Sequence, residues 1–279
     1  MFQINWKIKS LFYKILNFFK LYKPLYFIQK RVTKRSKVKI ENIVFYWNFH
    51  LKYLRENKSK KIIEIGAGKS LAQNIYLSYV LDKKIEQTVI DVSKMIDLDL
   101  FNNANQQISK ILNLKKFPEI KSISDLKENY NIIYLAPMSL KQIFDDNLRY
   151  DACISSTTLE HIPKDELIEN FKMLKRIIDN DGIISATIDY SDHYSHTDKN
   201  ISDLNYLKFN SKDWKKYNTP MLFQNRLRHQ DYRKIFKSIN FKIDEIKGDF
   251  GKSPGYISDE FDKNDKETFL LWGHFLLKH

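Results

Sequence analysis

The sequence contains one cysteine, Cys153, among 279 residues. An intramolecular disulfide is therefore excluded, and the apolar neighbours of Cys153 indicate a buried thiol in a reducing compartment, for which the cytoplasm is the simplest location. No group of cysteine and histidine residues has the spacing of a metal site, so no metal is expected. The 43% of hydrophobic residues are enough for a sizeable core.

Long uncharged apolar runs are also missing. None approaches the roughly 18 residues that span a bilayer, and no small-residue cleavage site follows a clean apolar stretch, so neither a transmembrane helix nor a signal peptide is expected. Residues 1–61 hold sixteen Lys or Arg against two Glu, a net charge of +14, which leaves −1 for the other 218 residues of a chain with +13. The positive charge belongs to the N-terminal arm and is not spread around a cleft, which makes a nucleic-acid partner unlikely.

That arm has a helical pattern. Leu11, Ile15, Phe18 and Tyr22 recur at helical spacing among scattered lysines, and a basic cluster follows over residues 30–39. We expect a basic amphipathic helical arm over residues 1–59. Its apolar face either packs on the globular part as a lid or lies on an anionic membrane surface through residues 1–40, on the inner face of the membrane.

The segment Ile62–Ser70 reads Ile-Ile-Glu-Ile-Gly-Ala-Gly-Lys-Ser. It predicts a buried strand that ends in a carboxylate and enters a glycine-rich turn, which lets the backbone approach a nucleotide-like ligand. The final Gly-Lys-Ser resembles the end of a P-loop, but Ile63 stands where that loop needs its first glycine. An adenosine site requires an acid after the next strand, and Asp91 lies 23 residues after Gly68. An ordinary strand-to-helix turn is the remaining alternative.

From residue 60 onward, short apolar strands alternate with helical stretches. We expect helices over Ser70–Val80 and Lys164–Ile178, and strands over Lys61–Ile65, Gln87–Asp91, Asn131–Leu135, Asp151–Ser155, Ile183–Ile188, Phe241–Ile246 and Thr268–Leu277. This order predicts an α/β, Rossmann-like domain over residues 60–279, with a seven-stranded, mostly parallel sheet and an antiparallel C-terminal strand pair. The region at about 190–240 breaks the alternation, and we expect it to form a substrate-side cap.

Three separated motifs in residues 60–278 resemble those of class I S-adenosylmethionine (SAM)-dependent methyltransferases. They are the glycine turn at 64–68, Asp91, and the strand Tyr150–Ser156 with its continuation Leu-Glu-His-Ile-Pro at 159–163. The resemblance implies SAM as cofactor, without a metal, with the turn against its methionine part and Asp91 on its ribose. The cofactor contacts that it implies come from Glu64, Gly66, Ala67, Gly68, Asp91, Val92, Met138 and Ser155.

Residues 188–196 and 223–228 are further similar to methyltransferases associated with bacterial surface-polysaccharide and capsule biosynthesis. That resemblance implies a small sugar-linked or phosphorylated acceptor. Arg226 and Arg228 would point the same way on an extended segment and would suit phosphate or carboxylate, although a structural ion-pair role is equally open. Trp214 offers a stacking surface or belongs to the core. Tyr190 and Asn225 complete the expected acceptor contacts.

Methyl transfer to a hydroxyl requires in-line alignment and a base that removes the proton. His193, oriented by Asp192, is the first candidate, and His161, beside Glu160, is the second; a structural hydrogen bond is the alternative for each. The expected function is therefore methyl transfer to an oxygen of a small capsule or surface-polysaccharide precursor. An RNA methyltransferase that uses the basic arm, and a SAM-binding scaffold without turnover, are the alternatives.

Overall fold

The computed structural model describes residues 3–19, 21, 40, 44–81 and 84–279. Tyr22 and the basic cluster at 30–39, both parts of the expected arm, lie outside the described residues. In the described part, no helix combines the length and the apolar character that crossing a membrane requires.

Seven strands form one sheet. They are β1 (Lys61–Ile65), β2 (Glu86–Ile90), β3 (Ile132–Leu135), β4 (Tyr150–Ser156), β5 (Ile178–Asp189), β6 (Lys242–Lys247) and β7 (Trp272–Lys278). The order across the sheet is β3-β2-β1-β4-β5-β7-β6, in which β1 to β5 run parallel and β7 runs antiparallel to β5 and β6. The predicted Rossmann-like sheet is therefore confirmed. Its order reverses between β1 and β4, where sheets of this kind open a crevice for ligands.

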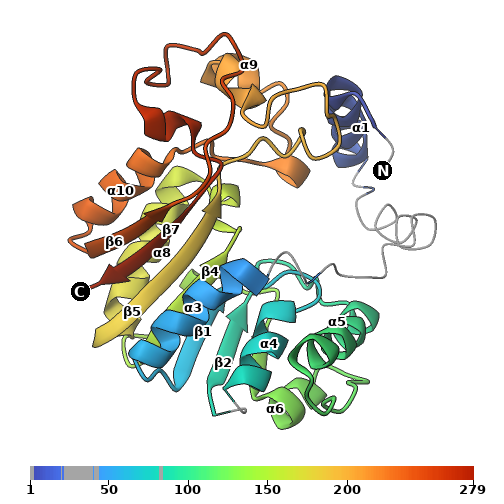
Figure 1. Ribbon diagram of the computed structural model, residues 1–279, viewed down its shortest axis with the longest axis vertical. Helices are drawn as coiled ribbons and strands as arrows, with labels where there is room; N and C mark the ends of the chain where they lie inside the picture. Colours follow the sequence, from blue (N-terminus) through green and yellow to red (C-terminus); the bar gives the residue numbers. More distant parts are fainter. Residues whose placement is uncertain (1–2, 20, 22–39, 41–43, 82–83) are drawn as a thin grey trace.

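Helices cover both faces of the sheet (Figure 1). One layer contains α3 (Val44–Glu56), α4 (Ala72–Val80), α5 (Leu98–Leu112) and α6 (Asp125–Tyr130), and the other contains α7 (Leu140–Ile143), α8 (Lys164–Ile177) and α10 (His229–Ser238). The remaining helices are α1 (Trp6–Phe18), α9 (Ser211–Trp214) and the 3-10 turns η1 (Leu159–His161), η2 (Asn205–Lys208), η3 (Pro220–Leu222) and η4 (Lys266–Phe269).

Successive side chains of the central strands pack into two separate hydrophobic cores, one on each face of the sheet, because side chains alternate between the two faces. Ile62 packs with the α3–α6 layer, and its neighbour Ile63 packs with α7, α8 and α10. Cys153 lies in the second core as a buried free thiol, as the sequence predicts. Burial raises the pKa of this thiol well above its usual range, so Cys153 is a packing residue.

The helix α3 belongs to the first of these cores, although the sequence places it in the arm. Trp47 is buried among residues of α4 and the sheet. The ring of His50 is fully buried and makes hydrogen bonds to Ser185 Oγ through Nδ1 (2.7 Å) and to Ser156 Oγ through Nε2 (2.9 Å). Burial, followed by the neighbouring His274, holds the pKa of His50 well below its usual value. The neutral ring thus fastens α3 to β4 and β5.

The strand β5 is longer than expected. Ile178 already pairs with Tyr150, and the register then shifts so that Ile183 pairs with Ala152. Asn180, Asp181 and Gly182 belong to the extra length between these pairs, a bulge inside the strand, whereas the expected strand begins only at Ile183.

The predicted cap is shorter than the expected 190–240 region. α10 packs on the sheet, so the cap comprises residues 190–228 together with the connection between β6 and β7. Its core contains Tyr194, Leu204, Tyr206, Leu207 and Trp214. In Figure 1 it stands above the carboxyl ends of the strands.

The helix α1 rests on this cap through its aromatic and polar face. The Trp6 ring is buried, with its centroid 4.6 Å from that of Tyr217 and 5.6 Å from that of Tyr194, and its backbone N–H donates to Asp198 Oδ2 (2.9 Å). The apolar face that the sequence predicts is turned away from the protein. Its exposed side chains are Ile8, Leu11, Phe12, Ile15, Phe18 and Phe19.

Candidate active site

A pocket of about 750 Å³ opens at the carboxyl ends of β1, β2 and β4. This is the point at which the strand order reverses. Its walls come from the turn after β1, the ends of β2 and β4, the helices α3 and α8, and the η3 segment of the cap. Its volume is in the range of small-molecule and cofactor sites.

The glycine turn approaches β4 closely. Gly66 has a φ of +79°, and a Cβ at this position would stand 2.3 Å from Thr158 Cγ2. Thr158 Oγ1 donates to the Gly66 carbonyl (3.0 Å), so the two crossing segments are joined. Gly68 has a φ of +70° and open space on its Cβ side. The predicted ligand-binding turn lines the pocket through Gly66, Ala67 and Gly68. Ser70 also lines the pocket, and Leu71 takes the left-handed conformation before α4.

Glu64 ends β1 as a buried carboxyl group that faces the pocket. Its two oxygens accept hydrogen bonds from Gln73 Nε2 (3.1 Å) and Asn74 Nδ2 (2.5 Å). Burial raises the pKa of Glu64 to about 8, against the opposing effect of the Asn74 hydrogen bond. Gln73 also accepts from Ser156 Oγ (2.6 Å), so a continuous buried chain of hydrogen bonds joins Glu64 to His50.

Asp91 follows β2 and lines the opposite wall. Its Oδ1 accepts from the backbone N–H of Ser93 (2.9 Å), and burial raises the pKa of its carboxyl group. Val92 and Met138 line the same wall with exposed side chains, and the Met138 N–H donates to the Asp91 carbonyl (2.8 Å). Asp91, Val92 and Met138, which the resemblance implies as cofactor contacts, thus line one wall of the pocket together.

Ser155 does not lie where the sequence predicts. Its side chain is buried and its Oγ donates to the Ile65 carbonyl (3.1 Å), because β4 places this position toward β1. The residues of this strand end that line the pocket are Ser156, Thr157 and Thr158. Ser155 is therefore a tie between two strands, and the prediction that it contacts the cofactor is corrected.

His161 presents its ring to the pocket from η1. Its Nδ1 donates to the Phe223 carbonyl (2.7 Å), which leaves the lone pair on Nε2 in the neutral ring. Packing around the ring lowers its pKa, against the opposing effect of the Phe223 bond.

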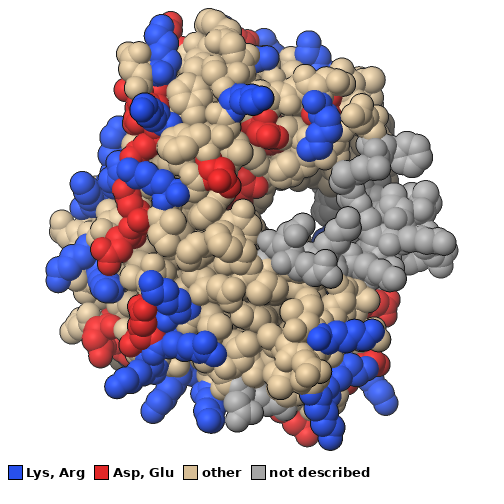
Figure 2. Space-filling view, in the orientation of Figure 1, with Lys and Arg blue, Asp and Glu red and all other residues tan. Residues whose placement is uncertain are grey.

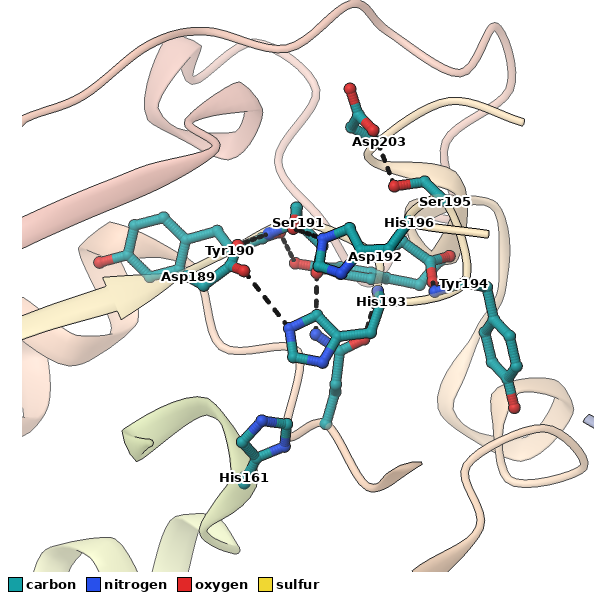
Figure 3. Close-up of polar contacts among 12 residues, drawn as sticks. His161, Asp189, Tyr190, Ser191, Asp192, His193, Tyr194, Ser195, His196 and Asp203 are labelled. Carbon is teal, nitrogen blue, oxygen red and sulfur yellow. Dashed lines mark hydrogen bonds and ion pairs between the residues drawn. The ribbon is translucent and has the colours of Figure 1, made fainter. Parts of the chain in front are cut away.

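His193 lies behind His161, with 4.9 Å between the ring centroids. Figure 3 shows the His193 ring between His161 and Asp189, whose Oδ2 is 3.4 Å from His193 Nε2. The sequence predicted Asp192 as the residue that orients this ring. Asp192 instead accepts from the Tyr194 N–H (2.8 Å) and Asn205 Nδ2 (3.2 Å) inside the cap, because the chain turns after β5. Asp189, the last residue of that strand, takes the place expected for Asp192.

The two arginines that the sequence predicts as contacts of the acceptor make hydrogen bonds within the cap instead. Arg228 is buried and donates to the carbonyls of Tyr190 (2.9 Å) and Leu270. Arg226 has a φ of +59° and donates to the Phe209 carbonyl (2.6 Å) and Ser211 Oγ (3.0 Å), with Glu260 at 3.3 Å. Neither lines the pocket among the described residues. The expected pair of free guanidinium groups for phosphate is therefore corrected.

The other predicted acceptor contacts are also structural. Trp214 is buried in the cap core, and the Tyr190 hydroxyl is buried against His229 Nδ1 (2.9 Å). Asn225 Nδ2 donates to the carbonyls of Leu159 and Ile162, both at 2.9 Å. Asn225 thereby holds the segment that carries His161, and it supports the site without lining it.

Several lining residues were not predicted. Tyr46 and Trp47 come from α3, Glu166 and Asn170 from α8, and Pro220, Met221 and Phe223 from the cap. The aromatic run at 45–47 and the position of Phe223 at the start of the segment 223–228 were the available signals. Among the described lining residues, Glu64, Asp91 and Glu166 supply carboxyl groups, whereas none is Lys or Arg. In Figure 2, tan and red atoms border the central opening on the side where the residues are described.

No family model matches the sequence, and no curated protein matches it significantly. Solved structures do match. A SAM-dependent methyltransferase from Clostridium acetobutylicum is 13% identical, with 92% of this chain and 97% of that chain covered and a TM-score of 0.46. The magnesium protoporphyrin IX methyltransferase of Synechocystis, with bound SAH, is 13% identical, with 84% and 81% covered and a TM-score of 0.47. The CurJ carbon methyltransferase is 13% identical with a TM-score of 0.45; 82% of this chain is covered, and the chain spans about half, 51%, of that structure's length.

Proposed function

We propose that the protein transfers a methyl group from SAM to an oxygen of a small acceptor. The observation that carries this proposal is the pocket itself: a left-handed glycine turn between two carboxyl groups, Glu64 and Asp91, at the reversal point of the sheet. Close backbone approach at Gly66 and Gly68 suits the extended methionine part of the cofactor, and Asp91 suits the two ribose hydroxyls.

The charge of the pocket supports this cofactor over a nucleotide with phosphates. SAM carries a sulfonium and an ammonium group against one carboxylate, so it is a net cation. Carboxyl groups line the pocket, and none of the described lining residues is Lys or Arg. Such a lining attracts a cationic ligand and repels an anionic one. A di- or triphosphate would need the cationic groups that these walls do not supply.

The acceptor end of the pocket lies at His161. In the transfer, the acceptor O–H gives its proton to an imidazole, the oxygen forms a bond to the methyl carbon, and the bond from that carbon to sulfur breaks with release of S-adenosylhomocysteine. Because His161 lines the pocket and His193 stands behind it, we assign the general base to His161 and a supporting position to His193.

The acceptor that we propose is a sugar-linked precursor of a capsule or surface polysaccharide. The resemblance of residues 188–196 and 223–228 is the support for it. A phosphorylated acceptor was expected because Arg226 and Arg228 could have bound its phosphate. Both guanidinium groups make hydrogen bonds within the cap, so a neutral sugar hydroxyl is favoured.

Calorimetry and turnover test the proposal together. We expect the full chain to bind SAM and not ATP, and to form S-adenosylhomocysteine with at least one member of a panel of sugars and sugar nucleotides. Binding of ATP with no binding of SAM would refute the cofactor. SAM binding without turnover on the whole panel would favour the non-catalytic scaffold, and salt-sensitive RNA binding that is lost with residues 1–40 would favour the RNA enzyme.

We further propose that α1 holds the protein on an anionic membrane surface. Five large apolar side chains of α1, together with the next residue Phe19, face solvent, and Phe18 is 80% exposed. Residues 1–40 contain eleven Lys or Arg and no Asp or Glu. Apolar side chains that insert at the interface, together with positive charge near anionic headgroups, are the combination that binds such surfaces, and the cytoplasmic leaflet is anionic.

Vesicle sedimentation tests this membrane contact. Leu11→Asp and Phe18→Asp should each lower binding to vesicles with anionic lipid by roughly tenfold, because a charge replaces an inserted apolar group. Tyr256→Asp, at a side chain that is 66% exposed elsewhere, is the matched control. Equal binding of all variants would contradict the proposal, and concentration-dependent dimerisation that is lost in the α1 variants would assign the face to a second copy of the chain.

A further inference from the structure

A cluster of side chains with metal-ligand chemistry lies where the pocket meets the cap. One ligand atom each from Glu160, His161 and His193 lies within 4.8 Å of the other two. The three come from two segments: η1 supplies the first two residues, and the turn after β5 supplies the third. No metal-ligand spacing marks this cluster in the sequence, because residues more than thirty positions apart converge only in the fold.

Glu160 is the unusual member. Its side chain is 3% exposed, and neither carboxyl oxygen has a hydrogen-bond partner. A buried carboxyl group without partners is costly, and native structures normally provide such a group with a donor, a cation or water. The Nε2 atom of His193 is also buried, and it lies 3.4 Å from Asp189 Oδ2. The unsatisfied carboxyl group of Glu160 is therefore the observation that points to a cation here.

The surrounding contacts resemble those that orient metal-binding imidazoles. His161 donates through Nδ1 to the Phe223 carbonyl, and such a bond fixes the other nitrogen as a free ligand atom. Asp189 approaches His193 at 3.4 Å and adds a second carboxylate beside the cluster (Figure 3). Asn225 holds η1 through the Leu159 and Ile162 carbonyls, so the ligands stand on a fixed segment.

We infer that Glu160, His161 and His193 bind a divalent transition-metal ion of the Mn²⁺, Fe²⁺ or Zn²⁺ class. Two imidazoles and one carboxylate suit these ions, whereas Mg²⁺ and Ca²⁺ prefer sites made entirely of oxygen. Metal-ligand bonds of about 2.1 Å allow at most about 4.2 Å between two ligand atoms on opposite sides of the ion. The ligand atoms lie within 4.8 Å of one another, so a contraction of at most about 0.6 Å brings them to this distance.

The position of the ion deepens the proposed function, on which its catalytic role rests. Because His161 lines the pocket, an ion at the cluster would bind the acceptor oxygen beside the methyl group. Coordination lowers the pKa of a bound hydroxyl, so the proton leaves to solvent water and the oxygen attacks as an alkoxide. The two histidines then hold the ion, which replaces the imidazole base that we assign to the metal-free site.

Direct metal binding tests the inference without SAM or acceptor. The chelator-treated full chain should bind one Zn²⁺ or Co²⁺ by calorimetry, and Co²⁺ should develop visible absorption bands. Glu160→Gln and His193→Ala should each weaken binding by about 10- to 100-fold or more, the scale found even for residues that only orient metal ligands. His161→Ala, at an exposed side chain, is the variant that keeps the test valid if the buried substitutions impair folding.

His196→Ala is the matched control, since its ring lies 5.1 Å from that of His193 but outside the cluster. Binding that survives all three cluster substitutions, or that His196→Ala weakens equally, would overturn the inference. Failure to bind SAM by a chain that binds the ion would refute the proposed function and leave the metal site intact. Binding of SAM by a chain that takes up no ion would do the reverse.

Discussion

Replacing Glu64 with Gln should stabilise the protein and weaken its cofactor binding at the same time. The folded protein holds the pKa of Glu64 at about 8, against an ordinary value of 4.5. Between these pH values the unfolded chain loses the Glu64 proton while the folded chain keeps it. The free energy of unfolding therefore falls as pH rises, by about 1.4 kcal/mol for each pH unit.

The accumulated cost is about 3 kcal/mol at pH 7 and about 5 kcal/mol above pH 8, as an order of magnitude. Glutamine does not titrate, so Glu64→Gln removes this pH dependence. It also keeps the shape of the side chain, and the Asn74 amide can turn its Oδ1, which is buried without a partner, toward the new NH₂ group. If the substitution weakens a hydrogen bond, the free energy of unfolding of the variant changes by the same amount at every pH. The pH dependence that is predicted to disappear is not affected by such a change.

Urea unfolding of both proteins at pH 5, 6, 7 and 8 measures the slope directly. The variant should gain on the wild type with each pH unit, and Glu169→Gln at an exposed carboxylate controls for the loss of one negative charge. If the free energies of unfolding of the variant and the wild type change in parallel with pH, the raised pKa of Glu64 is refuted. If SAM binds beside Glu64, the wild type should also release close to one proton on binding at pH 7, detected by calorimetry in buffers of different ionisation enthalpy, and Glu64→Gln should release none.

Further predictions concern the pocket walls and the cap. Asp91→Ala should weaken SAM binding by well over roughly tenfold, the scale of a lost charge-assisted hydrogen bond, and unchanged affinity in calorimetry would remove it from the ribose site. Gly66→Ala should destabilise the fold by more than Gly68→Ala, which adds left-handed strain of roughly 1–2 kcal/mol but no clash; equal unfolding midpoints would contradict the close approach to Thr158. Arg228→Met should cost about 1–3 kcal/mol, because the buried Leu270 carbonyl loses this donor, with SAM affinity retained. His193→Ala should lower turnover while cofactor affinity stays the same, and retained turnover would free His193 from the reaction.

The parts that the sequence predicted well are those with a strong local cause. The strand at 61–65 and its glycine turn follow from a run of β-branched residues that ends at residues able to take a positive φ, and both are found in place. The position of Asp91 at the end of the second strand was predictable because one strand-helix-strand unit has a typical length. In the same way, the order of alternating elements was enough to predict the sheet.

The parts that the sequence did not predict depend on side-chain direction. A spacing of two residues cannot tell whether Arg226 and Arg228 face a ligand or the interior of the cap, since tertiary packing decides this. The helical pattern at 11–18 identifies an apolar face but not whether it is turned inward; Trp6, outside that pattern, supplies the contact with the cap. The choice between Asp189 and Asp192 depends on a turn of the chain just beyond β5.

The position of α3 sets how far the chain can be shortened. A protein that begins at residue 60 retains every strand and the whole glycine turn, and in the sequence it resembles a complete catalytic unit. It would nevertheless lose the imidazole of His50, a hydrogen-bond partner of the buried Ser185 hydroxyl and of the half-buried Ser156 hydroxyl. It would also lose the indole of Trp47, which packs in the core and lines the pocket. The smallest unit that can fold independently therefore starts before α3, and the cofactor pocket is divided between a sheet and a helix that precedes it in the chain.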